Sequence, residues 1–177
     1  MNQIKTVWSV LGALAILTTA STFAAHHESG EKANLVARLG PADVPGIVLS
    51  GHTDVVPANP KSWQSDPFKM EQRGSRLFGR GTCDMKGGLA ASIIAAETFI
   101  EQHPDFSGAI EISGTADEES GGYGGVAYLA EHGHFNPDRV QHVIIPEPLQ
   151  KDRICLGHRG GWWAEIETKG EIAHGSM

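Results

Sequence analysis

Cysteine and basic residues are both scarce in this sequence. Two of its 177 residues are cysteines, Cys83 and Cys155, and their spacing matches no cysteine-based metal motif. Two alternatives stay open for this pair, free thiols or one disulfide. Lys and Arg number 14 against 21 Asp and Glu, a net charge of −7, and the basic residues are scattered. This balance argues against a nucleic-acid partner.

Internal repeats and low-complexity tracts are absent as well. What is present is a chain with 40% apolar and 20% charged residues, which is typical of a globular domain. Its length is sufficient for one domain with a real hydrophobic core. Glycine is frequent, with 22 residues, and indicates many tight turns.

The N-terminal segment differs from the rest of the chain. Val7 to Leu17 is apolar almost throughout, follows Lys5, and precedes the small residues Thr22 to Ala25. The apolar stretch has about half of the roughly 20 residues that a membrane-spanning helix needs. This layout is typical of a secretory signal peptide over residues 1–25, with a mature chain that is exported or periplasmic. The alternatives are an uncleaved anchor, a first helix of the fold, a misassigned start or a fused gene.

Strand-like and helix-like segments alternate along the remaining chain. Leu89 to Gln102 repeats apolar residues at helical spacing and ends just before Pro104, which predicts a helix. A second, short helix is predicted over Gly125 to His132. Strands are predicted at five segments: Ala33–Arg38, Gly46–Ser50, Arg76–Arg80, Ala109–Thr115 and Val140–Ile145. The alternation indicates an α/β fold with a mostly parallel sheet flanked by helices.

A histidine and an aspartate follow the strand Gly46–Ser50. His52 and Asp54 are two residues apart, so on an extended chain their side chains point to the same side. A metal-binding histidine usually donates its second ring N–H to a carboxylate, so this pair could supply a ligand and its orienting group. A histidine and an aspartate in an ordinary surface turn are the alternative.

Acidic residues follow three further predicted strands. Asp84 lies ahead of the predicted helix, where an aspartate could be only a helix cap, yet the glycines on both sides indicate tight packing around it. Asp117 to Glu119 would repel one another unless a positive group lies among them, although a solvated acidic turn is also common. Glu147 is held rigidly between two prolines.

These groups are expected to meet at one edge of the sheet. Ligands of parallel α/β sheets bind outside the carboxyl ends of the strands, and His52, Asp84, Glu118–Glu119 and Glu147 each follow a predicted strand. Several carboxylates gathered in one place need a cation. One histidine with Asp and Glu ligands suits Zn²⁺, while Co²⁺ or Mn²⁺ is also feasible.

Taken together, these stretches resemble a known enzyme family. SGHTDVVP, GRGTCDMKGG, TADEESGG, the Glu of PEP, GHRGG and KGEIAHGSM are similar to motifs of the zinc amidohydrolases and peptidases. That family includes acetylornithine deacetylase, succinyl-diaminopimelate desuccinylase, aminoacylase and carboxypeptidase G. The resemblance covers about Glu31 to Met177, and the deacylase branch fits best.

The resemblance implies a site with two zinc ions. His52 and Glu147 would bind the first zinc, Asp84 would bridge both ions, and Glu119 would bind the second. Asp54 would orient His52. In relatives the peptide bond after the bridging aspartate is cis.

The resemblance also implies the reaction and its catalytic residues. Glu118 would be the general base and acid in hydrolysis of the amide bond of an N-acyl amino acid. His174 would reach across a homodimer to the oxyanion in the partner's site, although an ordinary loop histidine is the alternative. A carboxypeptidase or dipeptidase, a non-catalytic metal-binding remnant and a secreted binding module are the competing functions. The resembled deacylases are usually cytoplasmic, which is the alternative to export.

The sequence departs from the family pattern at both ends. The signal-like segment occupies the place of the N-terminal helices of relatives, and the sequence stops within the lid, before the last histidine ligand of the second zinc. We therefore expect a partial catalytic domain over residues 28–157 and the start of a lid and dimerisation domain over 158–177, with a strand at Trp162–Thr168. Uncovered apolar surface and poor activity of this chain are expected to follow.

Overall fold

The structure is a computed structural model that describes residues 21–26, 32–150, 152–160 and 164–170. Its centre is a five-stranded sheet in the order β1-β2-β6-β3-β7. The strands are β1 (Ser21–His26), β2 (Ala33–Leu39), β3 (Gly46–His52), β6 (Ala109–Thr115) and β7 (Val140–Ile144). β3 pairs in parallel with β6 and β7, while β2 runs antiparallel to both β1 and β6. The mostly parallel α/β architecture is thereby confirmed, with β2 as the one reversed strand of this sheet.

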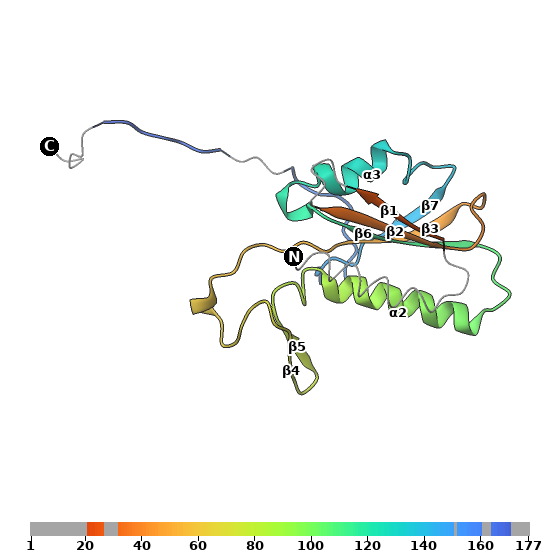
Figure 1. Ribbon diagram of the computed structural model, residues 1–177, viewed down its shortest axis with the longest axis horizontal. Coiled ribbons are helices and arrows are strands. Elements are labelled where there is room, and N and C mark those ends of the chain that lie inside the picture. Colours follow the sequence, from red (N-terminus) through yellow and green to blue (C-terminus); the bar gives the residue numbers. More distant parts are fainter. Residues whose placement is uncertain (1–20, 27–31, 151, 161–163, 171–177) are drawn as a thin grey trace.

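One face of the sheet is covered by helix α2 (Lys86–Gln102), as Figure 1 shows. The helix lays Leu89, Ile93 and Ala96 against Leu39 and Ile112 of the sheet, and these five residues form a buried apolar cluster. The helical apolar spacing in the sequence therefore predicts the packed face correctly, although α2 begins three residues before Leu89.

The opposite face of the sheet carries a short helical segment. A π-helical turn, η3 (Tyr123–Ala127), leads into α3 (Tyr128–Glu131), and a non-helical Gly125 breaks the segment. Gly125 is required there, because a Cβ on it would lie 2.0 Å from the carbonyl oxygen of Ala116. This contact holds η3 against the end of β6. The helix predicted over Gly125–His132 is present, with this interruption.

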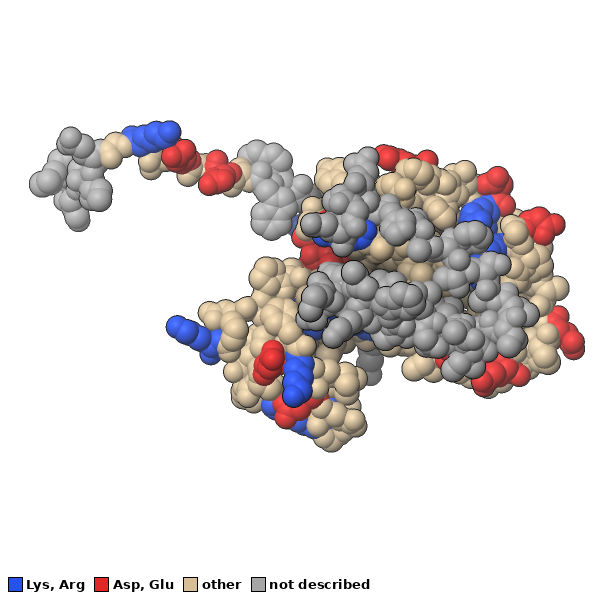
Figure 2. All heavy atoms as spheres, in the orientation of Figure 1, with Lys and Arg blue, Asp and Glu red and all other residues tan. Residues whose placement is uncertain are grey.

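A two-stranded hairpin projects from the body of the molecule. It consists of β4 (Glu71–Arg73) and β5 (Arg76–Phe78), and the short helix η1 (Pro60–Ser62) precedes it. The strand expected at Arg76–Arg80 therefore belongs to a separate sheet and ends at Phe78. Figure 2 shows acidic and basic side chains interspersed over the visible face of the described residues.

Apolar side chains are exposed along β7 and beyond it. Val143, Ile144 and Ile145 are 44, 51 and 57% exposed, in line with the apolar surface expected to lie uncovered. The strand expected at Trp162–Thr168 is wrong for its described part, residues 164–168, which have no strand conformation. Figure 1 shows this segment extending away from the sheet, so its backbone has no neighbouring strand to bond.

Two further expectations concern the N-terminus and the cysteines. Strand β1 covers residues 21–26, the end of the expected leader, whereas Val7–Leu17 lies outside the described residues. Within the described part of the chain, no helix combines the length and the apolar character needed to cross a membrane. Cys83 and Cys155 are free and exposed, which decides between the two alternatives for this pair.

Candidate metal centre

His52 is the buried centre of the site. It is the last residue of β3, paired in register with Thr115 at the end of β6, and only 2% of it is exposed. Thr53 continues the pairing, because its N–H donates to the carbonyl oxygen of Thr115 at 2.8 Å. The parallel strands therefore fix the backbone on which the imidazole stands.

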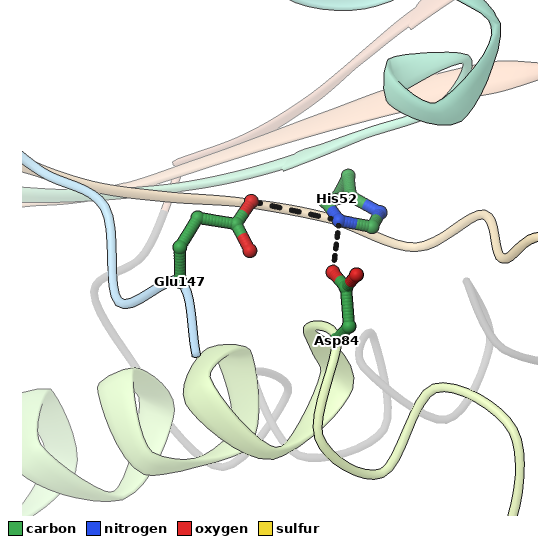
Figure 3. Close-up of side chains that lie close together, drawn as sticks. All are labelled: His52, Asp84 and Glu147. Atoms are coloured by element: carbon green, nitrogen blue, oxygen red, sulfur yellow. Dashed lines mark hydrogen bonds and ion pairs between the residues drawn. The ribbon is translucent and has the colours of Figure 1, made fainter. Parts of the chain in front are cut away.

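Three carboxylates surround one nitrogen of this imidazole. His52 Nε2 lies 3.1 Å from Asp84 Oδ1, 3.6 Å from Glu147 Oε1 and 3.7 Å from Glu118 Oε2. Figure 3 shows Asp84 and Glu147 approaching Nε2 from two different segments, the turn before α2 and the chain after β7. The sequence prediction that these groups converge is confirmed for all three acids.

The other imidazole nitrogen faces Asp54. His52 Nδ1 lies 3.0 Å from the backbone oxygen of Asp54 and 3.5 Å from its Oδ1. The Asp54 carboxylate also accepts the backbone N–H groups of Glu118 at 3.2 Å and Glu119 at 3.0 Å. Burial opposes ionisation of Asp54, but these hydrogen bonds, that of His52 first, lower its pKa overall. One aspartate thus orients the histidine and fixes the acidic loop beside it.

Asp84 reaches the site from a tight turn. The helix cap is Met85 and makes no side-chain capping bond, so the alternative role of Asp84 as a helix cap is wrong. Nor does Asp84 follow a strand of the main sheet, since β5 lies in the separate hairpin. The glycines explain its position: a Cβ on Gly88 would lie 2.2 Å from the Pro146 carbonyl oxygen, so only glycine lets α2 approach the segment that carries Glu147. The peptide bond between Asp84 and Met85 is cis, as expected.

The acidic loop after β6 places one carboxylate in a structural ion pair and two beside the site. Asp117 adopts a left-handed conformation with φ of 78°. Its carboxylate pairs with Lys32 at 2.5 Å, and this lysine is the positive group expected among the three acids. The next two residues, Glu118 and Glu119, are thereby left to face the site. Asn34, missed in the sequence, ties this loop to β2 by accepting the Ala116 N–H at 2.9 Å and donating to the Gly124 carbonyl at 2.8 Å. Its amide side chain at the start of a mostly apolar strand, which also contains Arg38, is the signal that could have identified it.

The site favours positive charge. Burial alone would lower the pKa of His52, but the hydrogen bond and charge of Asp54, with Asp84 and Glu118, raise it to about 9. For Glu147 and Glu119, burial raises the pKa first, and the charge of Asp84 adds to it. These shifts show that the crowded acids favour a positive charge at the site, which a metal cation would supply.

The distances fit a zinc ion. Two ligands of tetrahedral zinc lie about 3.3 Å apart, given Zn–N and Zn–O bonds of about 2.0 to 2.1 Å. The 3.1 Å and 3.6 Å separations of His52 Nε2 from Asp84 and Glu147 bracket this value. These three residues form one group of ligand atoms within 4.8 Å of one another, and His52, Glu118 and Glu119 form a second.

The sequence of residues 48–171 matches the family described as Peptidase family M20/M25/M40. The chain belongs to this family. A succinyl-diaminopimelate desuccinylase of Stenotrophomonas maltophilia is 40% identical over 154 residues, which are 84% of this chain and 41% of that protein. One from Beijerinckia indica is 38% identical over 175 residues, 93% of this chain and 45% of that protein. The chain thus spans about two fifths of the length of these M20 relatives.

Solved structures support the same fold. Human carnosine dipeptidase 1 superposes with a TM-score of 0.68 at 23% identity, over 82% of this chain and 33% of that one. The M20 metallo-carboxypeptidase Sso-CP2 from Sulfolobus solfataricus gives 0.66 at 18% identity, over 81% and 32%. At these identities the likeness concerns the fold alone, which is that of an M20 catalytic domain.

The roles assigned to the M20 site residues stay predictions, and two of them have no supporting geometry among the described residues. Asp84 and Glu119, expected to share the second zinc, do not fall in one ligand group among the described residues, although their charges interact. His174, expected at the oxyanion, lies outside the described residues.

Proposed function

We propose that this chain carries the metal site and the general base of a zinc-dependent hydrolase that cleaves the amide bond of N-acyl amino acids. The observation that carries the proposal is the position of His52, with one nitrogen against Asp54 and the other within 3.7 Å of Asp84, Glu118 and Glu147. A structural histidine needs one or two polar partners, whereas three acids at a single nitrogen indicate a cation site.

Each residue has a distinct part in this proposal. His52, Asp84 and Glu147 would hold the zinc, which when bound would supply a Lewis acid for the amide carbonyl and the attacking water. Co²⁺ is the alternative metal, and Glu119 with Asp84 would hold a second ion. Asp54 fixes the ring of His52 through Nδ1 and so presents Nε2 for binding.

Glu118 is the proton carrier of the proposed reaction. Its carboxylate is 50% exposed, next to the buried imidazole, and its backbone is held by Asp54. An exposed carboxylate can take a proton from the attacking water and release it to the leaving amine. Glu119 cannot replace it in this role if its own carboxylate binds metal.

The substrate class rests on the relatives. The curated relatives at about 40% identity are named succinyl-diaminopimelate desuccinylases, which supports an N-acyl amino acid as substrate. A peptidase activity is the competing proposal, supported by the family description. A homodimer and export are parts of the proposal that rest on the sequence patterns alone.

The direct test is hydrolysis by the purified, zinc-loaded chain. We expect slow release of the amino acid from N-succinyl and N-acetyl amino acids, in keeping with the poor activity expected of this chain, with loss of activity on adding a chelator and recovery with zinc. Dipeptides are the comparison substrate, and faster cleavage of dipeptides would favour the peptidase. The matched variants are Glu118→Gln, which should remove activity, and Glu131→Gln, an exposed glutamate of α3 that should not. Turnover that survives Glu118→Gln would contradict the mechanism.

A further inference from the structure

A second functional feature lies beside the metal centre. A cavity of about 260 Å³ is bounded on one side by Asp84 and Glu119, so it opens directly onto the site. Most of its wall is apolar or aromatic. Val56 and Trp63 come from the chain between β3 and the hairpin, and Leu77 and Phe78 come from β5 of the hairpin. Cavities that combine apolar walls with a few polar groups are typical of small-molecule subsites.

Arg80 is the one basic side chain in the lining of this cavity. Its guanidinium lies over the ring of Trp63, at 5.3 Å from the centroid, and Nη2 donates to the Pro57 carbonyl oxygen at 3.2 Å. Its backbone N–H bonds the Pro67 carbonyl oxygen at 2.6 Å. The side chain is therefore held in place by the loop that forms the wall.

Arg80 nevertheless has unused hydrogen-bonding capacity. Its Nε is buried without a hydrogen-bond partner, and Arg80 makes no ion pair within the part of the chain that the structure describes. A buried N–H without a partner is costly, and arginine offers five donors of which few are used here. Asp84 and Glu119, the two acids of the cavity, make no ion pair with the Arg80 guanidinium, because their carboxylates face the metal centre.

We propose that Arg80 binds a carboxylate of the substrate in this cavity. The proposal rests on the proposed function, because it places the scissile amide at the adjacent metal centre. A guanidinium with a fixed orientation suits a carboxylate better than any other group of an N-acyl amino acid. The apolar walls would contact the methylene groups between that carboxylate and the amide. The carboxylate belongs either to the acyl group or to the amino acid, and both are single negative groups on a short chain.

The test measures binding separately from turnover. Calorimetry on the zinc-loaded Glu118→Gln chain would compare N-succinyl-alanine, N-butyryl-alanine, which lacks the acyl carboxylate, and N-succinyl-propylamine, which lacks that of the amino acid. We expect one of the latter two to bind about tenfold more weakly than N-succinyl-alanine, a typical loss for a charged hydrogen bond. The weaker one identifies which carboxylate Arg80 binds.

Variants assign this preference to Arg80. Arg80→Gln should remove the tenfold difference by weakening N-succinyl-alanine, while Arg76→Gln, a change of the same charge on the exposed end of the hairpin, should preserve it. If Arg80→Gln does not fold, Arg80→Lys replaces it and should reduce the preference without abolishing it, because lysine lacks the fork geometry.

Each outcome separates the two proposals. Equal binding of the three compounds, or a preference that survives in Arg80→Gln, would overturn the assignment of Arg80 and leave the hydrolase proposal standing. Equal weakening of all three compounds in Arg80→Gln would show a structural role and would also overturn it. A preference that depends on Arg80, found together with no turnover by the unsubstituted zinc-loaded chain, would support the carboxylate subsite and contradict the proposed hydrolase.

Discussion

The two faces of the central sheet differ in the residues that they bury. On the α2 face, β6 contributes Ile112 to an apolar core with Leu39, Leu89 and Ile93. On the other face, its neighbour Glu111 is fully buried and pairs with Arg38 at 3.3 Å and Arg139 at 2.5 Å. His52 and Thr115 stand in the same register at the end of β3 and β6. The α2 face is thus closed by apolar burial, whereas the other face combines buried Val36 and Val48 with the buried ion pairs of Glu111.

The difference shows where function is placed in this fold. Apolar packing on α2 is tolerant of small shifts, because it has no direction. Hydrogen-bonded networks specify angles, and the site is held by such bonds: Asp54 to the acidic loop, Asn34 to Ala116, and Thr53 to Thr115. We therefore expect substitutions in the apolar cluster on the α2 face to lower the free energy of unfolding without changing zinc binding.

The largest expected effect belongs to the site itself. Glu118→Gln should reduce kcat by about 10²- to 10⁴-fold, the usual contribution of a general base, while zinc still binds. Steady-state kinetics with parallel zinc titration would measure both. Equal loss of zinc binding would show that Glu118 is a ligand instead, as its place in the second ligand group would allow.

Stability should respond on both faces, for different reasons. Glu111→Ala leaves the buried Arg38 without its ion pair and should cost about 3 to 5 kcal/mol in free energy of unfolding. Ile112→Ala removes buried methyl groups from the α2 face and should cost about 2 to 5 kcal/mol. Urea titration would measure both variants.

Folded Ile112→Ala protein should keep the zinc affinity of the original chain, because Ile112 packs with Leu89, Ile93 and Ala96 and not on a ligand residue. Weaker zinc binding in that variant, at a concentration where it is fully folded, would contradict the division between the faces.

Asp54→Asn should have an effect of intermediate size, and the quantity affected is the zinc affinity. Loss of the carboxylate that orients His52 is expected to weaken zinc binding by about 10- to 100-fold. The exposed Asp66→Asn, in the loop before the hairpin, is the matched control. Titration against a chromophoric chelator would measure both affinities, and an unchanged affinity in Asp54→Asn would remove Asp54 from the metal centre.

The smallest effect, about tenfold for each pH unit, is the pH dependence of zinc affinity. Metal binding needs the neutral imidazole, and the pKa of His52 in the metal-free chain is raised to about 9. The affinity should therefore increase by about tenfold per pH unit from pH 6 to 8, as one proton is displaced. Asp54→Asn should reach its plateau at a lower pH, because it removes the main group that raises this pKa. A flat profile from pH 6 to 8 would contradict the raised pKa.

Much of the fold could be predicted from the sequence because apolar patterns are local. The spacing of Leu89, Ile93 and Ala96 identifies the packed face of α2, and the β-branched runs identify β3, β6 and β7. The hairpin strand β4 was missed, because Glu71–Arg73 is three polar residues with no apolar alternation. The origin of Asp84 in a separate turn was missed because glycine contacts between distant segments leave no periodic pattern.

The site was predictable where residue types carry the chemistry. His52, Asp84, Glu118 and Glu147 were identified from the strand ends predicted ahead of them and from their common preference for metal, and the structure brings them together. The supporting residues were not, because Asn34, Arg80 and the Arg38–Glu111 pair are ordinary polar residues until the tertiary contacts bring them together.

Zinc K-edge X-ray absorption on the chain loaded with one equivalent of zinc tests the central claim most directly. We predict a shell of nitrogen and oxygen donors at about 2.0 to 2.1 Å with an imidazole contribution, lost in His52→Gln but kept in His142→Gln. A sulfur shell at about 2.3 Å would place the zinc on one of the two free cysteines, Cys83 or Cys155, and would contradict the His52–Asp84–Glu147 site. An imidazole signal that persists in His52→Gln would contradict it equally.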